Sequence, residues 1–343
     1  MSAFIDACWR EPTDHTPIWL MRQAGRYQAS YQAIRSKVSF LELCKTPDLA
    51  CQVTVDAVEQ LGVDAAIIFA DILLILDPLG VPFDFEKGHG PKIFDPIRTN
   101  AQIDEMPDEI DAEESLDYVM KAIELAKDAL DVPLIGFSAA PFTLAAYAIE
   151  GGGSKNYFET KKIMYGDEGA WKALMTKIAD ALAAYLLAQA DAGADALQLF
   201  DSWVGCLSPG DYDRYVAPYT ERIFDALDEL DDVPVLHFGT GNPELLGPMA
   251  EVGGDVIGVD WRIDLGDAWD RLGGPEEVAV QGNLEPAMLL APPDVMKKAA
   301  DKVLESAGGH PGHIFNLGHG IMPTATVDQV RQLVDHVHEV TSK

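Results

Sequence analysis

The sequence has few cysteines and little positive charge. Its 343 residues include four cysteines, none of them in a C-x-x-C pair, so the spacing does not fit the disulfide framework of a small secreted domain. The 25 lysines and arginines face 56 aspartates and glutamates, which gives a formal net charge of -31. Because a nucleic-acid-binding face must be positive, this balance argues against nucleic acid as a partner. We expect reduced thiols and an acidic, hydrated surface.

Long apolar segments are also missing. The first residues, MSAFIDACWREPTDHT, lack the basic start and apolar stretch of a signal peptide, and no uncharged apolar run reaches eighteen residues. We therefore expect a cytoplasmic protein that makes no use of a membrane. The hydrophobic content of 48% suits a globular chain with a large core. No linker rich in Pro, Gly or Ser divides the chain, so a single domain over residues 1–343 is expected.

What the sequence does contain is a series of eight short apolar runs rich in Val, Ile and Leu. Runs of this length without strict polar alternation predict strands that are buried on both faces of a parallel sheet. Segments with helical periodicity separate them, for example 114–130 and 170–190, whereas 80–107 shows no period and is expected to be a long loop. The runs begin at Pro17, Asp64, Val132, Asp195, Val233, Asp255, Val278 and His313.

One unit recurs along the chain. LGVDAAIIFAD from Leu61, AGADALQLFDS from Ala192 and, more loosely, VGGDVIGVDW from Val252 each place a glycine, an aspartate and then an apolar run. The glycine would end a helix, since glycine adopts positive φ without a Cβ clash. Repetition of one αβ unit with eight strands predicts an α/β fold of the (β/α)8 TIM-barrel type over an open doubly wound sheet. No G-x-G-x-x-G follows the first run, which also argues against a dinucleotide-binding fold.

A concentration of arginine marks the expected site. In a parallel barrel the active site lies at the carboxyl ends of the strands. Three of the ten arginines, Arg22, Arg26 and Arg35, lie within fourteen residues of one another just after the first run, although the chain as a whole is strongly acidic. Guanidinium groups bind carboxylates through two parallel hydrogen bonds and stay charged. The cluster therefore predicts a site for an anionic ligand.

The motifs at these strand ends resemble those of the uroporphyrinogen decarboxylase family, in family order and over nearly the whole chain. RQAGRY joined to a later NLGHG is the most specific combination. The residues that carry the resemblance are PIWLMRQAGRY (17–27), IIFADIL (67–73), GFSAAPFTLAAYAIEGGGS (136–154), LQLFDSWVG (197–205), GVDWR (258–262), VQGNLEP (280–286) and HIFNLGHGIMP (313–323).

The resemblance implies a reaction and its residues. The reaction is cofactor-independent decarboxylation of the four acetate side chains of uroporphyrinogen III to methyl groups, giving coproporphyrinogen III in haem and other tetrapyrrole biosynthesis, by a homodimer with no metal. Asp71 would accept hydrogen bonds from the pyrrole NH groups and stabilise the cation formed when a pyrrole carbon is protonated. Arg22 would be a second catalytic residue, as a candidate proton donor. The implied substrate-binding residues are Arg22, Gln23, Ala24, Gly25, Arg26, Asp71, Tyr147, Ser202 and His319.

Each of these positions also has an ordinary structural interpretation. Asp71 and Ser202 could cap the helices that follow them, and His319 could be satisfied by backbone groups. Arg35 is a further candidate ligand for substrate, in a loop whose sequence departs from the family pattern after Tyr27.

Two alternative functions need other features. Zinc-dependent methyltransferases that act on corrinoid proteins or coenzyme M share the fold, but they carry a His-x-Cys after the fifth strand and a second Cys near the end. This chain has His237-Phe238-Gly239 there and no cysteine after Cys206, so that thiolate zinc site cannot be assembled. A non-catalytic tetrapyrrole carrier is the other alternative, and the full set of site residues argues against it.

Overall fold

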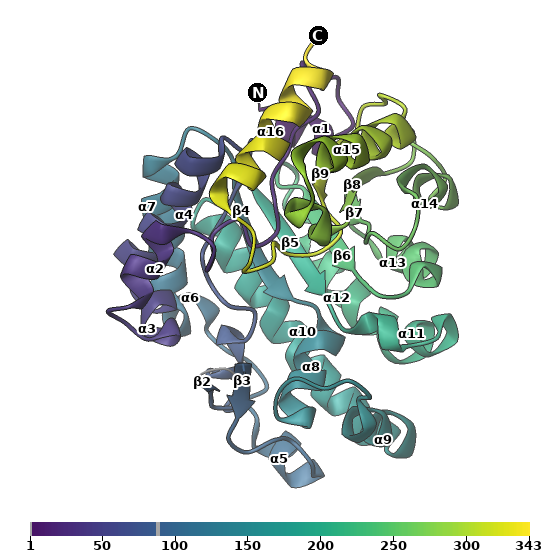
Figure 1. Cartoon of the computed structure of the whole chain (residues 1–343). Coiled ribbons are helices and arrows are strands. Elements are labelled where there is room, and N and C mark those ends of the chain that lie inside the picture. The colour runs from purple at the N-terminus through teal and green to yellow at the C-terminus, as the bar shows by residue number, and fades with distance from the viewer. Residues whose placement is uncertain (1, 87–89) are drawn as a thin grey trace.

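The computed structural model describes residues 2–86 and 90–343 and has one curled parallel sheet at its centre (Figure 1). Seven strands follow one another across the sheet in chain order, and every neighbouring pair is parallel. They correspond to seven of the eight predicted runs. The strands are β1 (Ala66–Ile67), β4 (Leu134–Ala139), β5 (Ala196–Asp201), β6 (Val235–Gly239), β7 (Val256–Gly258), β8 (Ala279–Leu284) and β9 (His313–Leu317).

The remaining run, from Pro17, lies between the first and last strands without forming a regular strand. On one side Ile18 makes a parallel bridge with Phe315 of β9, whose backbone N–H donates to the Pro17 carbonyl at 2.8 Å. On the other side the Asp64 N–H donates to the Ile18 carbonyl at 2.8 Å, just before β1. Pro17 has no N–H to give to a ladder, which helps to limit the pairing to one bridge.

Helices surround the sheet on its outer side (Figure 1). The predicted segments 114–130 and 170–190 are confirmed as α6 with α7 and as α10. Gly62, at φ 70°, ends α4 in the left-handed conformation expected for it. In the described part of the chain, no helix combines the length and apolar character needed to cross a bilayer. The α-helices are α1 (Ala3–Cys8), α2 (Ala29–Arg35), α3 (Phe40–Cys44), α4 (Pro47–Leu61), α5 (Asn100–Glu105), α6 (Ala112–Ser115), α7 (Asp117–Ala129), α8 (Pro141–Glu150), α9 (Phe158–Gly166), α10 (Glu168–Asp191), α11 (Pro209–Tyr215), α12 (Ala217–Leu227), α13 (Leu246–Val252), α14 (Leu265–Arg271), α15 (Pro293–Ala307) and α16 (Val327–Thr341), and the 3₁₀ helices are η1 (Leu74–Leu76), η2 (Val204–Cys206), η3 (Pro243–Leu245) and η4 (Pro286–Leu290).

The expectation of a long loop over 80–107 was wrong. An antiparallel hairpin of β2 (Phe83–Glu86) and β3 (Gly90–Ile93) lies there, followed by α5; residues 87–89 of this stretch fall outside the described part. Phe83 is buried, and Phe85 packs edge-on against Phe40 with ring centroids 4.6 Å apart. Thr99 and Gln102 form a capping box at the start of α5. The alternation F-D-F was too short to give a clear period.

The aspartate of the recurring unit has a definite structural role. In each unit the aspartate stands just before a strand, at the amino-terminal edge of the sheet. Its carboxylate accepts a hydrogen bond from a backbone N–H at the start of the preceding apolar run. We call these three hydrogen bonds the strand clamps. They join Asp64 to Ile18 at 2.7 Å, Asp195 to Leu134 at 2.7 Å and Asp255 to Val235 at 2.8 Å.

Candidate active site

The two most specific motifs, RQAGRY and NLGHG, are held together at the carboxyl end of the sheet. The Met21 N–H donates to Asn316 Oδ1 at 3.1 Å, and the Ile321 N–H donates to the Met21 carbonyl at 2.8 Å. A Cβ on Gly320 would lie 2.5 Å from Cδ of Arg22. Glycine is therefore required at 320 for the Arg22 side chain to lie across this loop.

Arg22 and Arg26 are exposed and available to an anionic ligand. Neither has an ion-pair partner among residues 2–86 and 90–343. Arg22 adopts a positive φ of 62°, which is unusual for a residue with a side chain and follows directly from the turn after Met21. Two exposed guanidinium groups four positions apart in an acidic chain, without ion-pair partners among the described residues, are consistent with carboxylate binding.

The remaining residues of this loop are turned toward the protein. Gln23 is buried: its side chain accepts a hydrogen bond from the Leu20 N–H at 3.2 Å and donates to the Ala65 carbonyl at 3.1 Å. Ala24 packs on a small apolar cluster, and the Gly25 N–H donates to Gln28 Oε1 at 3.0 Å. These contacts fix the loop shape and leave Arg22 and Arg26 as its charged groups.

Arg35 has partners of its own within α2 and the turn that follows. Its guanidinium donates to the Val38 carbonyl and lies 5.8 Å from the centre of the Phe40 ring. These contacts account for the side chain without a ligand, so the structure gives no support for Arg35 as a ligand for substrate.

Asp71 follows β1 and carries a perturbed pKa. Its Oδ1 accepts a hydrogen bond from the Leu73 N–H at 2.9 Å, as a helix-capping residue would. Within the described residues Oδ2 has no hydrogen-bond partner. Burial raises the pKa of Asp71 to about 6, while the Leu73 N–H and the charge of Arg22 act in the opposite direction. At pH 7 this carboxyl group is therefore mainly ionised, with one oxygen free to accept hydrogen bonds.

His319 is neutral at physiological pH and presents a hydrogen-bond donor. Its Nδ1 accepts from the Gly320 N–H at 2.7 Å, so in the neutral ring the proton lies on Nε2. Burial, together with the nearby charges of Arg22 and Arg262, lowers the pKa of His319 to about 4. His319 can therefore have a structural role and a binding role at once. Its Nδ1 accepts a hydrogen bond from the backbone, and its Nε2–H remains available to donate to a ligand.

Tyr147 lies on α8, the helix that follows β4, and Ser202 lies at the end of the neighbouring strand β5. Tyr147 stacks on Trp203, with ring centroids 3.7 Å apart, and burial together with the charge of Asp71 raises its pKa to about 12. The phenol therefore stays protonated and can donate. Ser202 is partly buried and directly follows β5.

A buried carboxyl group lies beside this pair. Asp201 accepts a hydrogen bond from the Thr143 hydroxyl at 2.7 Å, and the same hydroxyl accepts from the Trp203 N–H at 3.1 Å. Burial raises the pKa of Asp201 to about 7. The contacts link Asp201 to the aromatic stack that holds Tyr147.

Asp260 and Arg262, which follow β7, belong to the GVDWR motif but were not predicted as site residues. Asp260 is buried and accepts hydrogen bonds from Arg262 Nη1 at 2.6 Å and from the Thr240 hydroxyl at 2.8 Å. The Arg262 guanidinium lies 3.9 Å from the centre of the Trp261 ring and is near enough to His319 to affect its pKa. The signal in the sequence was the GVDWR motif at the end of a predicted strand, to which no role had been assigned.

These residues share one electrostatic environment. Arg22 affects the pKa of Asp71, Tyr147 and His319, although the four residues are far apart in the sequence. The arrangement places one carboxylate acceptor among exposed cations and neutral donors. It suits a ligand with several carboxylates and with NH groups near its centre.

The comparisons with known proteins agree over the whole chain. A family model described as uroporphyrinogen decarboxylase matches residues 1–340. Proteins of that name are similar to this chain in Carboxydothermus hydrogenoformans (51% identity over 99% of this chain and 96% of the relative) and in Sorangium cellulosum (52% over 98% and 96%).

Solved structures support the fold. A methyltransferase from Methanosarcina mazei superposes with a TM-score of 0.81 at 19% identity and 98% coverage of both chains. A B12-independent methionine synthase from Shewanella gives a TM-score of 0.58 at 11% identity, covering 89% of this chain and 90% of that one. At these identities the likeness concerns the fold alone.

Proposed function

This chain belongs to the uroporphyrinogen decarboxylase family, and from that we propose that it is a carboxy-lyase acting on uroporphyrinogen III. It would convert the four acetate side chains to methyl groups and release coproporphyrinogen III and CO2. Family membership over residues 1–340 supports the reaction. The single observation that carries the assignment of the site is the position of Asp71, with a free oxygen, in the electrostatic environment of Arg22, Tyr147 and His319.

We propose that substrate binding divides between carboxylates and pyrroles. Arg22 and Arg26 would bind substrate carboxylates, since both are charged and exposed and lack ion-pair partners among the described residues. His319 Nε2–H, the Tyr147 hydroxyl and Ser202 would add neutral hydrogen bonds. The Asp71 carboxylate would accept hydrogen bonds from the pyrrole NH groups, which lie at the centre of the macrocycle.

The chemistry would proceed through a ring cation. Protonation of a pyrrole carbon, with Arg22 as the candidate donor, makes a cation that the charge of Asp71 would stabilise in a partly buried site. The bond between the acetate methylene and its carboxylate then breaks. CO2 leaves, and the electron pair neutralises the cation. A proton added to the methylene carbon completes the methyl group, and the proton first placed on the ring carbon then leaves, which restores the pyrrole. Each decarboxylation thus takes up one proton in total, and because the ring itself acts as the electron sink, no cofactor is required.

We also propose the finer architecture predicted from sequence. The run from Pro17 is hydrogen-bonded on both sides, to β9 and to the residue before β1, which supports a closed (β/α)8 barrel forming one domain over residues 1–343. Family membership supports a homodimer in the cytoplasm. Phe94 and Phe158, exposed at 61% and 72%, are candidate contact residues for the second copy.

The function is tested by anaerobic turnover. Purified protein, treated with a chelator and given no added metal or cofactor, is expected to convert uroporphyrinogen III to coproporphyrinogen III, with products separated by chromatography. An Arg22→Gln variant, which removes one cation from the site, is the matched comparison. Its rate of uroporphyrinogen III conversion should fall steeply. Absence of turnover in the unmodified protein, or turnover abolished by the chelator, would contradict the proposal.

A further inference from the structure

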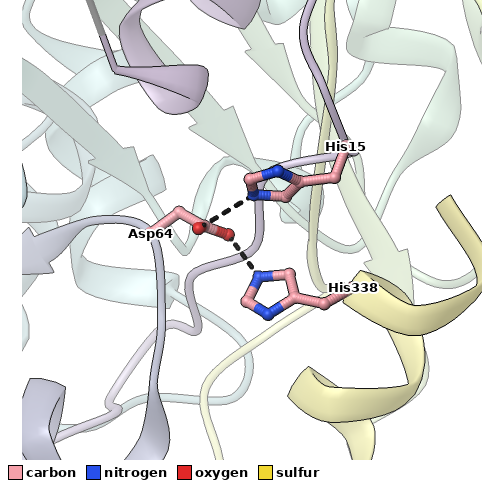
Figure 2. A group of neighbouring side chains, drawn as sticks. All are labelled: His15, Asp64 and His338. Carbon is pink, nitrogen blue, oxygen red and sulfur yellow. Dashed lines mark hydrogen bonds and ion pairs between the residues drawn. The ribbon is translucent and has the colours of Figure 1, made fainter. Parts of the chain in front are cut away.

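A second cluster of chemically competent side chains lies at the opposite end of the sheet from the candidate active site. Asp64 stands just before β1, His15 precedes the Pro17 run, and His338 projects from α16 (Figure 2). His15 Nε2 lies 3.0 Å from Asp64 Oδ1, and His338 Nε2 lies 2.8 Å from Asp64 Oδ2. The two rings meet edge to face, with centroids 4.9 Å apart.

The strand clamp explains Asp64 but neither histidine. Asp64 Oδ2 accepts the Ile18 N–H, as the aspartates of the other two units accept their own strand N–H groups. The equivalent Asp195 pairs with Lys127, an ordinary ion pair at 2.7 Å. The first unit therefore differs from the other two by placing two imidazoles against its aspartate. The hydrogen bond between Asp64 and Ile18 does not require either histidine.

The geometry of the cluster fits a transition-metal ion. Zinc binds histidine nitrogen and carboxylate oxygen at about 2.0–2.1 Å, so adjacent ligand atoms are about 2.9 Å apart in an octahedral site and about 3.3 Å in a tetrahedral one. Each histidine Nε2 lies near these separations from one oxygen of Asp64, His15 at 3.0 Å from Oδ1 and His338 at 2.8 Å from Oδ2, so both carboxylate oxygens face the histidines. One ligand atom from each of the three residues lies within 4.8 Å of the other two. Two histidines with one carboxylate are a donor set that suits zinc and its neighbours in the first transition series.

Solvent and metal can reach the cluster. The side chains of His15, Asp64 and His338 are 26%, 18% and 30% exposed. His15 also lines an open cavity of about 530 Å³. Water could therefore supply the remaining ligands. In the described part of the chain this is the one group of three or more His, Cys, Asp or Glu side chains close enough to share a metal ion.

We propose that His15, Asp64 and His338 form a binding site for Zn²⁺ that stabilises the fold and takes no part in catalysis. The ligands come from segments 49 and 274 residues from Asp64 in sequence. Only the folded chain brings them together, so bound zinc favours the folded state by linkage. The ion would join the amino-terminal segment, the start of β1 and the last helix at one point.

Zinc titration of chelator-treated full-length protein tests the proposal. Calorimetry should show one Zn²⁺ bound per chain, and the melting temperature should rise with zinc concentration. His15→Gln and His338→Gln keep a hydrogen-bond donor for Asp64 but lose a good metal ligand. Since even outer-shell partners of a metal site contribute 10–100-fold to affinity, each variant is expected to weaken zinc binding by at least about 100-fold and to abolish the zinc-dependent rise in melting temperature.

The matched control is His336→Gln. His336 lies on the same helix and bonds Asp301 at 2.7 Å, so it is a histidine–aspartate pair without a second histidine. This variant should bind zinc like the unmodified protein. Co²⁺ in place of zinc should give a d–d absorption band that both cluster variants lose and the control retains.

Two results would overturn the site. One is a dissociation constant for zinc weaker than about 1 mM in the unmodified protein; the other is an equal response in the cluster variants and in His336→Gln. Anaerobic turnover measured on the same samples keeps the two proposals separate, because His338→Gln should lose zinc binding while it retains decarboxylation. A protein that binds zinc as expected but does not decarboxylate the substrate would contradict the proposed function and leave the zinc site supported.

Discussion

Replacing Asp71 with asparagine is expected to stabilise the protein and to remove most of its activity. The asparagine side chain would keep an oxygen that accepts the Leu73 N–H, so the local turn survives. It would lose the charge that burial opposes. Because the pKa of Asp71 is raised from 3.8 to about 6, ionising this group costs folding free energy at neutral pH.

The size and pH dependence of this cost follow from the pKa. At about 1.4 kcal/mol for each pH unit, the change from 3.8 to about 6 corresponds to ~3 kcal/mol. Asp71 is only partly buried, so water reduces this figure and ~3 kcal/mol is an upper limit. The folded state binds the proton more tightly than the unfolded state, so the cost is full above pH 6, falls to about half at pH 5, and disappears below pH 3.8.

Urea unfolding at pH 7.5 and pH 5 measures the effect. The Asp71→Asn variant should be more stable than the unmodified protein at pH 7.5, by a margin that shrinks at pH 5. Asp232, exposed in the turn before β6, provides the control: Asp232→Asn should change stability by less than about 0.5 kcal/mol.

Activity is measured on the same samples under anaerobic conditions. Loss of a preorganised charge is expected to reduce turnover by about 10²–10³-fold, and the stability gain excludes unfolding as the cause. An Asp71→Asn protein that is less stable at pH 7.5, or equally stabilised at both pH values, would refute the account of the pKa. Unchanged turnover would remove Asp71 from the mechanism.

Two further predictions concern the same site. Because the required form of Asp71 is the carboxylate, kcat/KM should fall about tenfold for each pH unit below about 6, and a profile that stays level down to pH 5 would contradict this role. Arg262→Gln should raise KM more than it lowers kcat, since Arg262 lies beside His319 at the rim and pairs with Asp260; Arg271→Gln, which breaks an exposed pair with Glu244, is the control, and equal kinetics in the two variants would place Arg262 outside the substrate site.

The sequence predicted strand positions well, because each buried strand is a local pattern that its own residues reveal. The run from Pro17 and the hairpin at 83–93 were harder. The first depends on partners almost 300 residues away, such as Phe315, and the second alternates over too few residues to give a period. Local information was enough for elements whose own side chains form the core.

The site was predicted less evenly than the fold. The strand positions place Asp71 and His319 at strand ends, and the family resemblance then identified them as candidate site residues. Whether a side chain remains free for a ligand depends on remote neighbours. Gln23 is bound by Ala65, and Arg35 by Val38 and Phe40, and no motif shows this. Arg262 was not predicted as a site residue because its proximity to His319 arises only when β7 and β9 lie in one sheet.

The strand clamps set an order on events during synthesis. In each of them the carboxylate comes later in the chain than the N–H it accepts, by 46 residues for Asp64, 61 for Asp195 and 20 for Asp255. A chain that emerges from its amino terminus therefore presents each run before the residue that secures it. Each run lacks its strand-clamp hydrogen bond until the next unit has been synthesised. The number of residues that must be added first is largest for β4 and smallest for β6.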